Sequence, residues 1–307
     1  MDGLRIGFPD GEAEAVRGVS FELAAGEVFA LVGESGAGKS LTARALLGMV
    51  PRAATVRGRV LLDGGPVTPA DLGRRVAWIP QDAMAALSPV HRVEDQLAFA
   101  IRSVTRTGRR DARSAARRAL AAVGLGPEAA HAYPHALSGG MRQRAVIAMA
   151  LVNGPALVVA DEPTTALDPE RQEAVLTLLR ERCAAAGATL LLVSHDLPAV
   201  RRHADRVAVM YAGRITELGS AEQVLERPVA PYTRGLLASL PRTGLPRRAR
   251  LPVLAGAPPA PGAGGAGCGF APRCPGADDL CRREEPTLRT VDARAVACHH
   301  PTGEATA

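Results

Sequence analysis

The chain has almost no lysine. Of its 37 basic side chains, 36 are arginine and one is Lys39. Aromatic residues make up only 3 % of the 307 residues, which argues against a surface that stacks the bases of single-stranded nucleic acid. No apolar run is long enough to span a membrane, and residues 1–10 do not resemble a signal peptide. We therefore expect a cytoplasmic protein whose membrane role, if it has one, is peripheral.

The solitary lysine and the basic balance both carry information. The planar fork of arginine is bulkier than a compact ammonium, so a lysine retained at one position indicates a tight site there.

The formal charge is +6, and the densest basic run, from Arg102 to Arg118, holds seven arginines. We interpret this run as a solvated helix face. Contact with nucleic acid or with an anionic membrane surface is the alternative.

The order of apolar segments predicts an α/β fold. Buried strands are expected at 28–32, 76–79, 157–160 and 189–193, and helices at 39–48, 142–153 and 169–186. This alternation indicates a mostly parallel sheet covered by helices. An N-terminal antiparallel β layer is expected from the segments 4–8, 19–23 and 59–62.

Changes in composition divide the chain into parts. A main domain is expected over 1–240, with an alanine- and arginine-rich helical insert at about 89–140. In residues 241–267, proline, glycine and alanine supply 18 of 27 positions, which is typical of a linker. A small cysteine-rich C-terminal extension follows at 268–303.

Residues 33–40 read Gly-Glu-Ser-Gly-Ala-Gly-Lys-Ser and fit the phosphate-binding loop pattern, between a predicted strand and a predicted helix. The glycines let successive N–H groups converge on one anion, and the helix start adds its dipole. We expect Lys39 to reach the β- and γ-phosphates of ATP and Ser40 to ligate Mg²⁺. The residues expected at the nucleotide are Gly33, Glu34, Ser35, Gly36, Ala37, Gly38, Lys39, Ser40 and Leu41.

Two carboxylates, Asp161 and Glu162, follow the predicted strand 157–160. Burying them is costly unless they have a role. Asp161 is placed to hold the magnesium shell, and Glu162 to polarise the attacking water as a general base. An acidic strand-to-loop junction without chemistry is the alternative, which the phosphate loop disfavours.

Ser138, Gly139 and Gly140 lie in the segment Leu-Ser-Gly-Gly-Met-Arg-Gln and open a predicted helix, which makes a second anion-binding helix start. A phosphate loop, then this segment, then Asp-Glu resembles the ABC ATPase family, over residues 4–226. The resemblance implies that the Leu-Ser-Gly-Gly loop binds the ATP held by an opposite subunit. Two subunits would then close head to tail around two nucleotides.

The resemblance assigns further roles. Gln81 is similar to the glutamine that senses magnesium and water and couples to the membrane subunits. Asp168 ends the segment Ala-Leu-Asp at 166–168, which is similar to the loop that signals between the two sites. His195 is similar to the switch histidine that contacts the γ-phosphate. Phe8 occupies the position at which the family usually has a tyrosine that stacks on the adenine. The implied Mg²⁺ ligands are Ser40, Gln81 and Asp161.

The segment from Cys268 to Pro275 resembles the C-terminal extension of oligopeptide and dipeptide importer ATPases, as do residues 81–89 and 232–237. Importers of nickel and other small solutes share parts of this pattern. The resemblance implies an ATPase that drives uptake of di- or oligopeptides, or of a related small solute, at the cytoplasmic face of the membrane. The implied partners are two permease subunits, a second ABC ATPase subunit and, indirectly, an extracytoplasmic solute-binding protein.

Four of the five cysteines, Cys268, Cys274, Cys281 and Cys298, lie in the extension. Zinc sites usually have ligand pairs two to four residues apart, and this spacing has none. Four thiolates around an iron–sulfur cluster, of the 4Fe-4S type, fit better, and zinc or no metal remain alternatives. The extension is expected to be separate from the nucleotide site and to need the metal for folding. Cys183 is expected to be a buried small hydrophobe.

The sequence also disfavours two alternative functions. A soluble ABC ATPase acting on nucleic acid or ribosomes usually carries two cassettes or long inserts, whereas this chain predicts one compact cassette. A GTPase needs Asn-Lys-x-Asp to read guanine, and this motif is impossible with Lys39 as the sole lysine. A kinase would leave residues 137–143 unexplained.

Overall fold

The computed structural model describes residues 1–9, 14–165, 167–241, 252–260 and 265–302. Contacts within the chain define two compact units. Unit 1 comprises Met1–Glu22, Ala30–Pro66 and His195–Ala307, and unit 2 comprises Leu23–Phe29 and Val67–Ser194. Over the described ranges, the structure contains no helix that is long and apolar enough to cross a bilayer.

Unit 1 begins with a three-stranded antiparallel sheet in the order β2-β1-β4. Its strands are β1 (Asp2–Gly7), β2 (Val16–Val19) and β4 (Thr55–Arg59). Leu4 and Ile6 of β1 are buried, as are Val16 and Val19 of β2. The predicted antiparallel layer is therefore present, but β2 and β4 end where the predicted strands 19–23 and 59–62 begin. A short hairpin, β5 (Leu61–Leu62) and β6 (Gly65–Pro66), follows.

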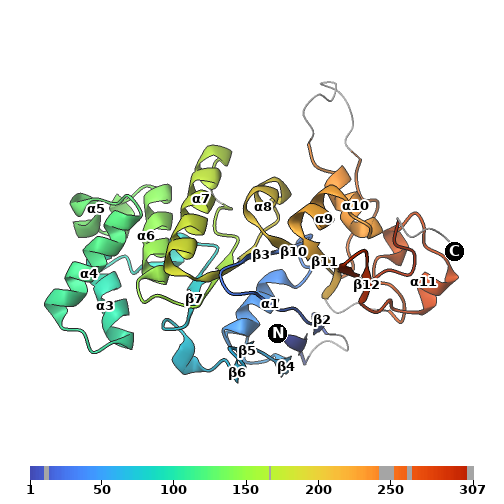
Figure 1. Ribbon diagram of the computed structural model, residues 1–307, viewed down its shortest axis with the longest axis horizontal. Helices are drawn as coiled ribbons and strands as arrows, with labels where there is room; N and C mark the ends of the chain where they lie inside the picture. Colours follow the sequence, from blue (N-terminus) through green and yellow to red (C-terminus); the bar gives the residue numbers. More distant parts are fainter. Residues whose placement is uncertain (10–13, 166, 242–251, 261–264, 303–307) are drawn as a thin grey trace. The chain divides into compact units, whose positions relative to one another are not determined.

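The rest of unit 1 combines helices with a second antiparallel set of strands. The helical elements are α1 (Lys39–Leu46), α8 (Leu197–His203), α9 (Ala221–Glu226), α10 (Pro231–Ala238), η3 (Ala271–Arg273) and α11 (Asp279–Arg283). The strands are β10 (Arg206–Tyr211), β11 (Arg214–Ser220), β12 (Arg289–Val291) and β13 (Arg294–Val296). Pairing runs β10 to β11, β11 to β13 and β13 to β12, so the extension continues the sheet edge of the main domain (Figure 1).

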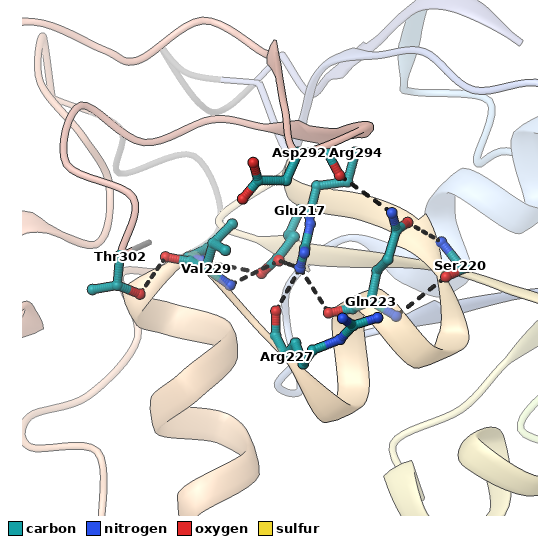
Figure 2. Close-up of polar contacts among 9 residues, drawn as sticks. Glu217, Ser220, Gln223, Arg227, Val229, Asp292, Arg294 and Thr302 are labelled. Atoms are coloured by element: carbon teal, nitrogen blue, oxygen red, sulfur yellow. Dashed lines mark hydrogen bonds and ion pairs between the residues drawn. The ribbon is translucent and has the colours of Figure 1, made fainter. Parts of the chain in front are cut away.

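A buried ion pair fastens the extension to β11. Glu217 is fully buried and accepts hydrogen bonds from the backbone N–H groups of Val229 and Ala230, at 3.0 and 3.1 Å. Arg294 of β13 lies 3.4 Å from Glu217 and donates to the carbonyl oxygens of Gln223 and Arg227 (Figure 2). Removing one partner of such a pair typically costs about 3–5 kcal/mol of stability, because a charge is left buried.

The extension also packs through aromatic and ionic contacts. Phe270 is buried edge-on against Tyr211 of β10 and Tyr232 of α10, with ring centroids 5.3 Å apart in each pair. The carboxylate of Glu285 pairs with Arg17 and with Arg214. The extension therefore packs against the rest of unit 1 through its own side chains, and its need for a metal stays a prediction.

Unit 2 holds the parallel strands. β7 (Val76–Ile79), β8 (Leu157–Asp161) and β9 (Thr189–Val193) pair in parallel, with Val76 opposite Leu157 and Leu157 opposite Thr189. Every residue of β8 and β9 is buried, as expected of parallel strands covered on both faces. The helices of this unit are η1 (Pro69–Asp71), α2 (Ala83–Ala86), α3 (Val93–Val104), α4 (Arg109–Ala122), α5 (Pro127–His131), η2 (Pro134–Ala136), α6 (Gly139–Leu151) and α7 (Pro169–Ala186). Strand β3 (Val28–Val32) begins in unit 2 and ends in unit 1.

The predicted helical insert corresponds to α3, α4, α5 and η2, drawn in green in Figure 1. The arginine run crosses from α3 into α4, and two of its side chains pair with carboxylates of α3. Arg113 lies 2.7 Å from Asp95, and Arg117 lies 2.7 Å from the buried Glu94. Both arginine side chains are more than half exposed, so this part of the run is a solvated helix face, as predicted.

Most of the predicted linker, at 242–251 and 261–264, lies outside the described residues. The proposed boundaries at 240 and 267 therefore stay a prediction. Cys183 is buried in α7, and burial raises the pKa of its thiol to about 12, which confirms it as a core residue.

Candidate functional site

The phosphate loop connects β3 to α1 in a conformation that only glycine tolerates at several positions. Gly33, Gly36 and Gly38 all have positive φ, at 145°, 80° and 97°. A Cβ at Gly33 would stand 2.1 Å from the carbonyl oxygen of Met210, so no other residue fits there. Gly38 is the N-cap of α1. Because glycine has no side chain, Gly38 does not cap the first backbone N–H groups of the helix. This is the backbone arrangement that binds phosphate at helix starts.

Lys39 points back over this loop. Its side-chain nitrogen donates to the carbonyl oxygens of Gly33 and Glu34, at 2.9 and 3.0 Å, and the residue is only 5 % exposed. The ammonium is thus held inside the curve of the loop. The tight site that the lysine composition predicts is present in the geometry.

In unit 2, Glu162 follows β8 in a strained backbone conformation. Its φ is 48°, which is uncommon for a residue with a side chain and is often associated with functional positions. The Glu162 carboxylate accepts hydrogen bonds from Gln81 Nε2 at 3.3 Å and from Thr165 Oγ1 at 3.1 Å. Asp161, the last residue of β8, is buried. The structure therefore brings Gln81 and Glu162 together, although 81 residues separate them.

Ser138 is the N-cap of α6. Its hydroxyl accepts a hydrogen bond from the backbone N–H of Met141 at 3.3 Å, so the helix begins at Gly139 rather than at the predicted Arg142. Glycines at 139 and 140 leave this helix start without bulky side chains. The arrangement is a second backbone site suited to an anion.

The other predicted site residues occupy loops and helix starts. Asp168 caps α7 by accepting from the N–H of Arg171 at 3.0 Å, while Ala166 of the same motif lies outside the described residues. His195 is exposed and follows β9. Phe8 lies just beyond β1 and is 36 % exposed, so its ring is accessible.

The four cysteines of the extension are unpaired thiols, and three are half-buried while Cys281 is buried. Burial raises the pKa of Cys298 to about 11, and the thiols of the other three cysteines add to that shift. Among the described residues, the one group of possible ligand atoms lying within 4.8 Å of one another is Asp278, Cys281 and His300. The other three thiols thus lie close enough to Cys298 to raise its pKa, but the four sulfur atoms do not all lie within 4.8 Å of one another.

Two residues far along the chain hold Glu34, and the sequence does not predict either contact. The backbone N–H of Glu34 donates to the hydroxyl of Tyr232 at 3.0 Å, and its carboxylate is paired with Arg273. The expected separation between the extension and the phosphate loop is therefore wrong. No local pattern marks these contacts, because Tyr232 and Arg273 lie about 200 residues or more further along the chain.

Comparison with known families and proteins agrees with this architecture. Residues 16–165 match the family described as "ABC transporter", and residues 216–281 match "Oligopeptide/dipeptide transporter, C-terminal region". The dipeptide transport ATP-binding protein DppD of Bacillus subtilis is 42 % identical over 313 residues, covering 97 % of this chain and 93 % of that protein. The oligopeptide transport ATP-binding protein OppD of Escherichia coli is 39 % identical, covering 98 % and 92 %.

OppD of Mycobacterium bovis is 44 % identical over 92 % of this chain, but the chain spans about half of that relative, 48 %. Among solved structures, cbiO1 from Clostridium perfringens, part of the ABC transporter complex cbiONQ, aligns with a TM-score of 0.63 at 26 % identity. That alignment covers 74 % of this chain and 91 % of cbiO1. The dimeric ATP-binding cassette MJ0796, bound to ADP and Pi, shares the fold with a TM-score of 0.60 at 24 % identity, over 71 % of this chain and 98 % of that one. The chain therefore belongs to the ABC transporter ATP-binding family, in the group that carries the oligopeptide/dipeptide transporter C-terminal region.

Proposed function

We propose that this protein is the ATP-hydrolysing subunit of an ABC importer that takes up di- or oligopeptides or a related small solute. The observation that carries the proposal is the glycine loop of residues 33–38, curled around the buried ammonium of Lys39, in a chain that shares its C-terminal region with oligopeptide and dipeptide transporters. The solute class rests on the names of the relatives DppD and OppD.

In the proposed reaction, the phosphate loop and Lys39 would hold the phosphates of ATP, and Ser40, Gln81 and Asp161 would hold Mg²⁺. Glu162 acts as the general base on the attacking water, and the hydrogen bonds from Gln81 and Thr165 fix the direction of its carboxylate. His195 contacts the γ-phosphate. Phe8 stacks on the adenine.

The proposed assembly is peripheral at the cytoplasmic face of the membrane. The backbone start of α6, at residues 138–140, would bind the ATP of a second ABC ATPase subunit, identical or similar, and Asp168 would signal between the two sites. Two permease subunits would receive the motion of this dimer. A solute-binding protein outside the membrane would act indirectly.

Uptake by cells tests the proposal. Deleting the gene for this protein, or replacing Lys39 by alanine, should abolish uptake of radiolabelled dipeptides or tripeptides, and the parent gene should restore it. Uptake of a free amino acid is the control. Unchanged peptide uptake, combined with salt-dependent binding of the protein to DNA or ribosomes, would instead favour a soluble ABC ATPase acting on nucleic acid.

For the extension, we propose that Cys268, Cys274, Cys281 and Cys298 ligate an iron–sulfur cluster, with zinc as the alternative. Support comes from three of these thiols, Cys268, Cys281 and Cys298, whose pKa values are raised chiefly by burial and which a bound metal would deprotonate. Protein purified without oxygen should then be brown and contain iron and sulfide. Stoichiometric zinc without iron would select the alternative, and a metal-free, protease-resistant extension would contradict both.

A further inference from the structure

One side chain of the C-terminal extension, Arg273, reaches the phosphate loop. Its two terminal nitrogens donate separately to the two carboxylate oxygens of Glu34, at 2.7 Å from Nη1 to Oε2 and 3.0 Å from Nη2 to Oε1. The Arg273 side chain is 5 % exposed and that of Glu34 is 23 % exposed. A two-pronged contact of this kind, shielded from water, is stronger and more directional than an exposed surface pair.

Arg273 is held in this position from several sides. Its Nε donates to the carbonyl oxygen of Ala255 at 2.9 Å, and its Nη1 also donates to the hydroxyl of Tyr211 at 3.2 Å. The guanidinium carbon lies 5.7 Å from the ring centroid of Tyr211 and 5.9 Å from that of Phe270. The hydrogen bonds to Glu34 raise the pKa of Arg273 further, so the guanidinium stays charged.

Glu34 creates an electrostatic problem for the loop. The loop has to attract the phosphates of a nucleotide, yet Glu34 puts a full negative charge within it. The backbone of Glu34 is already engaged, because its N–H donates to Tyr232 and its carbonyl oxygen accepts from Lys39. Because the backbone of Glu34 is held in this way, the effect of its carboxylate on a bound anion depends on the charge of the side chain that pairs with the carboxylate.

We propose that Arg273 is a positioning residue of the nucleotide site, which neutralises the carboxylate of Glu34 and fixes its direction, so that the loop presents net positive charge to the phosphates. The inference rests on the proposed function, because it presupposes that this loop binds ATP. This role makes the C-terminal extension part of the nucleotide-binding site. Arg273 acts on the site through Glu34 and does not touch the nucleotide.

Charge substitutions in the full-length subunit test this inference, with the dissociation constant for MgATP measured by displacement of a fluorescent ATP analogue. Arg273→Gln should weaken ATP binding about tenfold, the size expected for one uncompensated unit charge roughly 10 Å from an anion near a protein surface. Glu34→Gln alone should tighten binding, because Arg273 then adds an uncompensated positive charge. Combining Glu34→Gln with Arg273→Gln should return the affinity to within about twofold of the parent.

The matched control is Arg282→Gln, which removes the same charge from the same extension. Arg282 pairs with Asp279 at 3.0 Å, and both side chains are largely exposed, so the ATP affinity should not change. Thermal unfolding and protease resistance of each variant report whether the extension stays folded. Glu34→Gln leaves Arg273 and its contacts to Ala255 and Tyr211 in place, so it tests the charge argument even if Arg273→Gln loosens the extension.

Three results would overturn the inference: parental affinity in Arg273→Gln, weaker binding in Glu34→Gln, or a double variant as weak as Arg273→Gln alone. The last result would mean that Arg273 acts on the shape of the loop and not through charge. Lys39→Ala separates these failures from a failure of the proposed function. If Lys39→Ala also binds ATP like the parent, the nucleotide site itself is misplaced.

Discussion

Glu162→Gln is expected to bind ATP but to hydrolyse it about 10²- to 10⁴-fold more slowly than the parent, because a positioned general base contributes that much to the rate. Glutamine has nearly the shape of glutamate, and its side-chain oxygen can still accept hydrogen bonds from Gln81 and Thr165. The change therefore removes basicity with little change in geometry. Steady-state phosphate release and equilibrium ATP binding should be measured on the same preparation.

The ATP-bound form of Glu162→Gln should accumulate as a dimer, with itself or with its partner ATPase, and size-exclusion chromatography with and without ATP would detect it. Glu170→Gln is the matched control. It makes the same chemical change at an exposed position in the first turn of α7 and should turn over like the parent. Near-normal turnover in Glu162→Gln would remove Glu162 from the general-base role.

Lys39→Arg is expected to harm ATP binding almost as much as Lys39→Ala. The Lys39 ammonium sits 2.9 and 3.0 Å from two loop carbonyl oxygens and is almost fully buried, so the wider arginine fork has no room there. Losing a charge-assisted hydrogen bond costs about 1.5–3 kcal/mol, which corresponds to roughly 10- to 100-fold in the dissociation constant. Titration of each variant with a fluorescent ATP analogue would measure this loss.

The reverse exchange at an exposed position, Arg44→Lys in the last turn of the same helix, is the control for this pair of variants. It should bind ATP like the parent, because an exposed basic side chain has room for either head group. If Lys39→Arg also bound like the parent, the link between the solitary lysine and a tight site would be lost.

Much of the fold could be predicted because the buried strands are uninterrupted apolar runs. The predicted strands 28–32, 76–79 and 189–193 have the bounds of β3, β7 and β9, and the predicted helix 169–186 has the bounds of α7. Errors arose where the local pattern and the pairing disagree. Apolar residues alternate through 19–23, yet pairing with β1 stops at Val19, so the strand lies earlier than predicted.

The contacts of the extension could not be predicted, because they join residues far apart in a chain with many equivalent partners. Arg273 is one of 36 arginines, and nothing in its neighbourhood in the sequence distinguishes Glu34 as its partner. The same holds for Arg294 and Glu217, which are 77 residues apart. Motifs reveal chemistry that is local in the sequence, whereas these ion pairs depend on the tertiary fold, and the Arg294–Glu217 pair on how β11 and β13 pair.

The distance along the chain between Glu34 and Arg273 has a consequence for synthesis. The ribosome makes Glu34 239 residues before Arg273. At translation rates of about 5–20 residues per second, roughly 12 to 48 s pass between the two. For that interval the nascent chain carries the Glu34 carboxylate without the guanidinium that pairs with it in the finished protein.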